Sequence, residues 1–175
     1  FLALSIFLGV WVFSNFMVDN DPERALFWTR TTFFSVIWAS YFFLEFTLNF
    51  PTKTALSISK RYLVFAVSAI IALVVYSPVF ILGVYDDNSV TLFTPGPLYE
   101  LFILYYIFVI VCAFIVLVRS LVRSRGLNRL RLKVVLLALS AMTIVTTTTN
   151  LVLPELFNYY KLTPYGGYAT IIFTV

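Results

Sequence analysis

Long apolar runs alternate with short polar segments along the chain, and the lengths of these runs predict helices rather than strands. Five runs approach the roughly 20 residues that an α-helix needs to cross the hydrocarbon core of a bilayer, and a sixth run begins near residue 165. The runs cover approximately residues 1–18, 26–50, 62–84, 98–118, 134–153 and 165–175. Membrane-spanning strands need only about 10 residues. We therefore expect an all-α membrane protein, a multi-span transmembrane helical bundle with five spans plus the start of a sixth.

Prolines support most of these boundaries. Pro51, Pro97, Pro154 and Pro164 lie at or beside predicted helix ends, where proline is tolerated. Pro78 lies inside the third run, so we expect a kink there. The first run starts without a polar leader and the last stops partway. We expect residues 1–175 to be one transmembrane domain that is truncated at both ends.

The composition agrees with a lipid environment and disfavours catalysis. Hydrophobic residues make up 61% of the chain and charged residues 11%, whereas soluble proteins carry about 25% charged residues. The chain has no histidine and one cysteine, Cys112, so the commonest general base and metal ligand is missing. We find no phosphate-binding glycine-rich loop and no metalloprotease motif. We expect this segment not to be an enzyme and to hold no cofactor and no metal.

The distribution of charge predicts the orientation. Segments 51–61 and 119–133 hold nine of the twelve basic residues, namely Lys53, Lys60, Arg61, Arg119, Arg123, Arg125, Arg129, Arg131 and Lys133. Seven of the eight acids lie in the alternate loops. The positive-inside rule makes the two basic loops cytoplasmic, so we expect a multi-pass protein of the plasma membrane. Arg30, near the outer end of its span, can extend to the interface.

The segment 119–133, "RSLVRSRGLNRLRLK", allows several interpretations. It could be a nucleic-acid patch, a site for lipid head groups, or a loop that couples to another domain. Short cytoplasmic loops of membrane proteins are ordinarily basic and touch anionic lipid. We favour this topological interpretation, with the lipid bilayer as partner and no nucleic acid.

Polar residues interrupt the fifth run near its outer end. Thr143, Thr146, Thr147 and Asn150 recur at helical spacing and share one face. A threonine hydroxyl can bond to its own helix, so the face can simply pack against a neighbouring helix. It can also line a cavity that opens outward. An amide cannot satisfy all its donors and acceptors within one helix, so we retain Thr143, Thr147 and Asn150 as ligand-binding candidates.

Glu45 is the acid inside a predicted span, and Asn49 lies one turn away on the same face. A carboxylate at that depth should face the bundle interior and find a partner. Because Glu45 lies towards the cytoplasmic end, Arg119, Arg131 or Lys133 could reach it. We expect an ion pair, either structural or acting as a coupling contact.

Two blocks resemble a known family. The first, "ALFWTRTTFFSVIWASYFFLEFTLNFP", is similar to a span with an aromatic-Trp-x-Arg start and a Phe-Pro end. The second, "RLRLKVVLLALSAMTIVTTTTNLVLPELFNYYKLTPYGGYATIIF", is similar to a basic loop followed by two spans joined by an Asn-Leu-x-Leu-Pro turn. Both resemble the N-terminal seven-transmembrane sensor region of bacterial and archaeal histidine kinases. The resemblance implies that the chain covers about spans two to seven.

The resemblance implies a sensory input domain of a signal-transducing receptor, typically a two-component histidine kinase. The stimulus would be relayed through the last span to a cytoplasmic output domain of the same chain beyond Val175. A second copy, forming a homodimer, is a further candidate partner. A small transporter or permease subunit is the alternative, although the polar groups lie near span ends rather than at the midplane that transporters use. A structural assembly subunit is a third interpretation.

Overall fold

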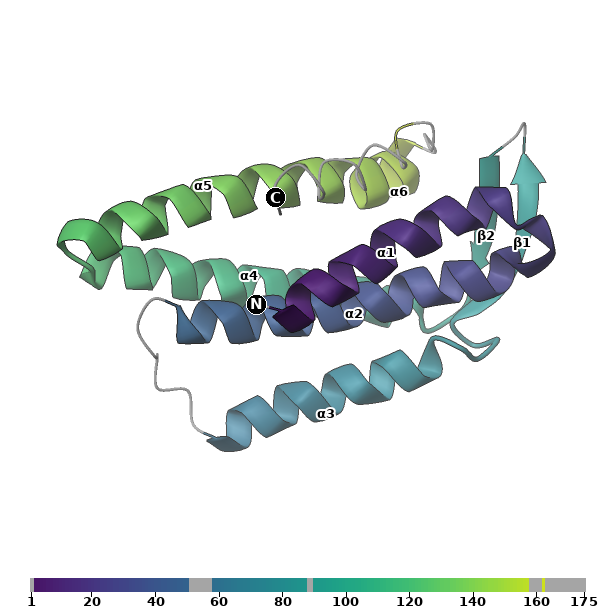
Figure 1. Cartoon of the computed structure of the whole chain (residues 1–175). Helices are drawn as coiled ribbons and strands as arrows, with labels where there is room; N and C mark the ends of the chain where they lie inside the picture. Colours follow the sequence, from purple (N-terminus) through teal and green to yellow (C-terminus); the bar gives the residue numbers. More distant parts are fainter. Residues whose placement is uncertain (1, 51–57, 88–89, 158–161, 163–175) are drawn as a thin grey trace.

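The computed structural model describes residues 2–50, 58–87, 90–157 and 162, and its long helices lie side by side (Figure 1). Within this part, four helical stretches are long and apolar enough to cross a membrane: Leu2–Asn20, Pro22–Asn49, Tyr99–Arg123 and Gly126–Val152. They correspond to α1 (Leu2–Asn20), the 3-10 turn η1 (Pro22–Arg24) with α2 (Ala25–Asn49), α4 (Tyr99–Arg123), and α5 (Gly126–Thr147) with the π-helical turn η2 (Thr148–Val152). The predicted all-α membrane bundle is confirmed.

Helix α2 is the centre of the bundle. It packs against α1 along much of its length and also contacts α3 (Ile58–Val74) and α4. Its apolar residues lie on all sides rather than on one stripe, which is typical of a helix enclosed by others. Ser35, Ser40 and Thr47 are buried and bond to carbonyl oxygens of their own helix. Such small, internally satisfied residues let neighbouring helices approach closely.

The third predicted span is wrong in its last part. The helix α3 ends at Val74 rather than near residue 84, and two reversing turns follow, closed by Ser77 N–H to Val74 O at 2.9 Å and Phe80 N–H to Ser77 O at 3.2 Å. Pro78 lies within the second turn and has no N–H to continue a helix. At 17 residues, α3 is at the lower limit of length for crossing a bilayer.

The chain continues into a β-hairpin that the sequence analysis did not predict and whose first residues, 81–84, belong to the third apolar run. Strands β1 (Ile81–Asp87) and β2 (Val90–Pro95) pair antiparallel, with an irregularity between Ile81 and Gly83. The strand pair leads into α4 through Gly96, whose N–H donates to Phe80 O at 2.8 Å. A Cβ on Gly96 would collide with the carbonyl of Val79, so this close passage requires glycine.

The two ends of the bundle differ (Figure 1). One end carries η1, β1 and β2, and is called the hairpin end below. The other, the basic end, carries the end of α2, the start of α3 and the turn between α4 and α5. This turn reverses at Gly126, whose φ of 58° lies in the left-handed region that favours glycine.

The last described helices change their winding. After α5 the five residues Thr148–Val152 form a π-helical turn, and α6 (Leu153–Phe157) follows. Leu153 N–H bonds to Thr148 O, five residues back. Pro154 cannot donate to Asn150, and its ring would press on that carbonyl in an ordinary α-helix. The wider turn relieves this conflict. The sixth predicted run, 165–175, lies outside the described residues.

Candidate functional site

The polar face of α5 forms hydrogen bonds of two kinds. The buried hydroxyl of Thr146 donates to Met142 O at 2.9 Å, and that of Thr149 to Val145 O at 2.9 Å. Both therefore satisfy themselves within their own helix, as the packing interpretation expects. Thr147 instead reaches α4, where its hydroxyl lies 3.1 Å from the Tyr106 hydroxyl.

Asn150 lies within the π-helical turn and is half-buried. Its amide nitrogen donates to Thr146 O and to the Thr149 hydroxyl, each at 3.0 Å. Asn150 therefore stabilises the widened turn locally, while Thr143 is half-buried one turn before Thr147. A ligand-binding role for Thr143, Thr147 and Asn150 stays a prediction.

Arg30 connects α2 to the hairpin. Its guanidinium donates from Nη2 to the carbonyl of Ile81 at 3.0 Å, across 51 residues of sequence. Arg30 is half-buried and Ile81 is fully buried, so the side chain holds the base of β1 rather than extending to the interface. Two residues earlier, Trp28 Nε1 donates to Asp21 Oδ2 at 3.0 Å. The Trp-x-Arg pattern thus bonds α2 to the residue that precedes η1 and to the start of β1.

Aromatic rings fill the space between α2, the hairpin and α4. The ring of Phe33 lies 5.2–5.6 Å, between centroids, from four other rings, those of Phe80, Phe93, Tyr99 and Phe102. All four meet it edge-on, which is a favourable geometry for aromatic pairs. Together with Arg30 these rings make the hairpin end a connected unit.

At the basic end, the Glu45 carboxylate forms an ion pair, but its partner is not one of the cations expected from the sequence. Glu45 Oε2 lies 3.4 Å from Arg61 Nη2, at the start of α3. Asn49 Nδ2 donates to Glu45 O at 2.6 Å and lies 3.4 Å from Glu45 Oε2, and Arg61 Nη2 donates to Asn49 Oδ1 at 3.3 Å. The expected proximity of Glu45 and Asn49 is present in this cluster.

The expectation that segment 119–133 supplies the cation for Glu45 is corrected here. Arg131 and Lys133 are exposed on α5, on either side of the fully buried Leu132. Arg61 lies in the first turn of α3, the helix that follows α2 in the chain, and it supplies the cation for Glu45. A coupling role for Glu45, Asn49, Arg131 and Lys133 stays a prediction.

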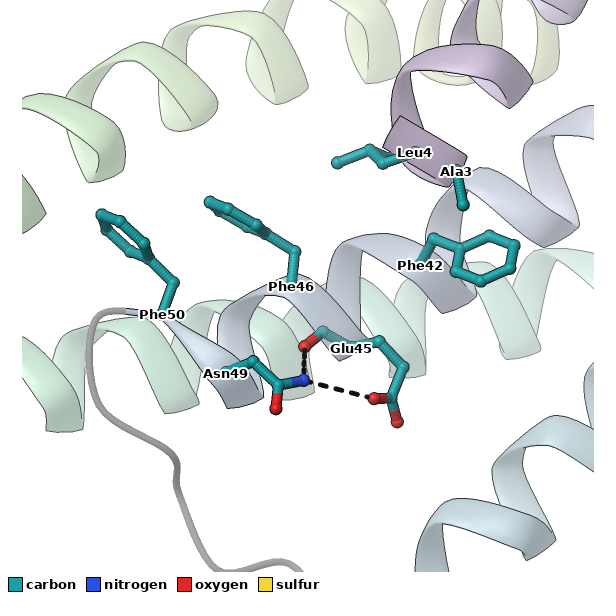
Figure 2. A pocket seen from close by; sticks show the side chains of 7 residues that line it. All are labelled: Ala3, Leu4, Phe42, Glu45, Phe46, Asn49 and Phe50. Atoms are coloured by element: carbon teal, nitrogen blue, oxygen red, sulfur yellow. Dashed lines mark hydrogen bonds between the residues drawn. The ribbon is translucent and has the colours of Figure 1, made fainter. Parts of the chain in front are cut away.

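A shallow pocket of about 310 Å³ lies beside this cluster (Figure 2). Its lining consists of Ala3, Leu4, Phe42, Glu45, Phe46, Asn49 and Phe50. The rings of Phe46 and Phe50 stack at 5.2 Å on one side of α2, whereas Glu45 and Asn49 project to the other side. The polar groups therefore form a rim, and the pocket has an aromatic wall. Among the described residues, no three His, Cys, Asp or Glu side chains group as a metal site would require.

Sequence reasoning missed Arg61 and the Arg30–Ile81 contact. Arg61 belongs to the basic segment 51–61 rather than to 119–133, so its closeness to Glu45 in the chain was the available signal. The Arg30 contact depends on the hairpin, which was not predicted; its first residues, 81–84, were assigned to the third helical run. Turn residues around Pro78 and the β-branched and aromatic residues of "VTLFTP" were the available signals for the hairpin.

Comparison with known proteins identifies a family. The family model described as the N-terminal 7TM region of histidine kinase matches residues 1–175. No curated protein and no solved structure matches the chain significantly.

Proposed function

Because the chain belongs to the family of N-terminal 7TM regions of histidine kinases, we propose that it is the membrane-embedded sensory input domain of a two-component histidine kinase. The observation that carries the proposal is the family match, which extends over all of residues 1–175. The sequence contains no histidine. The histidine that such a kinase phosphorylates therefore belongs to an output domain outside these residues.

In this proposal the protein lies in the plasma membrane, with the hairpin end facing outward and the basic end facing the cytoplasm. The supporting observation is that nine of the twelve basic residues belong to segments 51–61 and 119–133. Asp86 and Asp87 of β1 and Glu23 of η1 belong to the opposite end. An output domain would follow the last span on the cytoplasmic side.

The relay begins at the hairpin in this proposal. Arg30 bonds the hairpin to α2, and the passage at Gly96 bonds it to α4. Both helices run from the hairpin end to the basic end (Figure 1). A displacement of the hairpin would therefore act on two spans together.

The kinase part of the proposal can be tested on the full-length protein in membrane vesicles. We expect transfer of the terminal phosphate of ATP to a histidine, seen as acid-labile and base-stable label. Arg30→Gln should change the extent of labelling, whereas Arg24→Gln, an exposed arginine in η1, should not. Absence of any label, combined with further spans and no soluble domain after Val175, would favour a transporter.

The orientation has its own test. In a Cys112→Ala background, single cysteines replace Glu23 of η1 and Ser124 of the α4–α5 turn. On intact cells an impermeant thiol reagent should label the cysteine at position 23 and leave that at 124 unlabelled until the membrane is opened. The reverse pattern would invert the proposed topology.

A further inference from the structure

The turn between α4 and α5 concentrates positive charge without any compensating acid. Six cations lie on this turn and on the two helix ends that it joins, and all are exposed: Arg119, Arg123, Arg125, Arg129, Arg131 and Lys133. The sequence has no Asp or Glu between Glu100 and Glu155. Only two residues separate the end of α4 at Arg123 from the start of α5 at Gly126. The cations are therefore held on two helix ends that are joined by a tight turn.

The first turns of α5 also present a stripe of exposed apolar side chains. Leu127, Leu130, Val134 and Leu137 are 64%, 60%, 62% and 76% exposed. Their spacing of three, four and three residues keeps them on one face of the helix. Leu132, on the opposite face, is fully buried against the rest of the bundle. The apolar stripe thus faces away from the protein.

Two of the cations lie on either side of this stripe. Successive residues of an α-helix are about 100° apart around its axis. Arg131 therefore follows Leu130 on one side of the stripe, and Lys133 precedes Val134 on the other. Both lie at the level where the stripe passes from the turn into the span. The arrangement combines an apolar track with a cation on each edge.

We propose that this face of α5 is a binding site for an anionic membrane phospholipid. The acyl chain would lie along Val134 and Leu137, and the head-group phosphate would contact Arg131 and Lys133. Basic side chains at a membrane surface attract anionic lipids, and long cationic side chains next to an apolar span reach the interface readily. A nucleic acid or an acidic soluble protein could pair with the charges but has no acyl chain to lie along the apolar stripe, so a phospholipid is the partner that matches both features.

The site gives the start of α5 a second attachment. Within the described part of the chain α5 packs on α4, while the side chains of its apolar stripe are exposed. A bound lipid would fix this helix at the membrane surface from the other side. The inference does not depend on kinase output; only the leaflet involved, the cytoplasmic one, depends on the proposed orientation.

The test is lipid retention by the purified chain in native mass spectrometry. The probes are phosphatidylglycerol, which is anionic, and phosphatidylcholine, which is zwitterionic, supplied at equal concentration. We expect the wild-type protein to retain phosphatidylglycerol preferentially. The double variant Arg131→Gln with Lys133→Gln should lower this preference about 25-fold, and each single variant about fivefold, which keeps the test usable if the double variant does not accumulate.

Two matched variants separate this site from general charge. Arg24→Gln with Lys60→Gln removes the same number of exposed cations elsewhere and should leave the preference unchanged. Arg131→Lys with Lys133→Arg keeps both charges and should also retain it. Equal retention of the two lipids by the wild type, or an equal loss in the Arg24 and Lys60 variant, would overturn the proposal. Displacement of the lipid by an equal concentration of inorganic phosphate would also overturn it, because the site would then recognise a free anion.

Discussion

Helices α2 and α5 are both long and apolar, yet they relate to the bundle in opposite ways. Helix α2 buries ten of its residues and contacts α1, α3, α4 and the hairpin. Helix α5 buries Leu132 and Thr146 and packs on α4. Hydrophobicity alone therefore does not tell which helix is central in a membrane protein, because lipid and protein interior are equally apolar. The difference should appear when matched substitutions are made in the two helices.

The largest difference should come from shortening the same residue type in each helix. Ile37 of α2 is fully buried, whereas Ile144 of α5 is 65% exposed. Ile37→Ala leaves a cavity among packed helices and should lower the free energy of unfolding by about 2–5 kcal/mol. Ile144→Ala should change it by less than about 0.5 kcal/mol. Reversible denaturation in mixed micelles measures both, and equal losses would remove the distinction between the helices.

Arginines in the two helices should also differ. Arg30→Gln leaves the buried carbonyl of Ile81 without its donor, which should cost about 1–3 kcal/mol. Arg131→Gln on α5 removes an exposed charge and should be nearly neutral in unfolding. Amide hydrogen exchange gives a more local measurement, since only Arg30→Gln should speed exchange in β1 and β2. Unchanged protection of the hairpin would show that Arg30 does not hold it.

Asn150→Leu tests what the polar end of α5 does. The change removes the donations to Thr146 O and the Thr149 hydroxyl, and should destabilise the protein by about 1 kcal/mol. If these residues only shape the helix, histidine phosphorylation per folded molecule should stay normal. Loss of response at normal abundance would instead make Asn150 a ligand contact. Thr148→Val, at an exposed position of the same turn, serves as the control.

The smallest expected effect concerns the partly exposed ion pair at the basic end. Glu45→Gln should lower stability by about 0.5 kcal/mol, as partly solvated pairs typically do. Arg61→Gln should produce little additional loss in the Glu45→Gln background, because the two share one contact. Lys133→Gln should add independently. Coupling of Glu45 to Lys133 instead of Arg61 would restore one of the three partners expected from the sequence.

The length of apolar runs was sufficient to predict the long helices. Spanning helices must satisfy every backbone group internally, so runs near 26–50 and 98–118 could only be helices, and α2 and α4 occupy them. The prediction for the run at 62–84 was wrong in its last part because a short apolar stretch can form either a helix or a strand. Composition does not distinguish these two structures over so few residues. Pro78 indicated a kink, but the chain leaves the helix four residues before it.

The candidate site was less predictable than the fold. Asn49 was expected beside Glu45 because helical spacing fixes neighbours within one helix. Arg61 and Ile81 belong to other elements, and spacing within one helix does not determine which neighbour comes close. The exposure of Arg131 and Lys133 likewise depends on which face of α5 meets α4. The sequence does not determine that face, because lipid and protein neighbours both accept apolar side chains.

The π-helical turn before Pro154 can be regarded as the insertion of one residue into an α-helix. A helix with one π-turn contains one residue more than the α-helix it replaces, so the segment Thr148–Val152 is equivalent to an α-helical turn with a single inserted residue. That residue turns everything after it by about 100° around the helix axis. Loss of the extra residue would bring the ring of Pro154 against the preceding turn. The inserted residue and the proline should therefore be gained and lost together as such chains diverge.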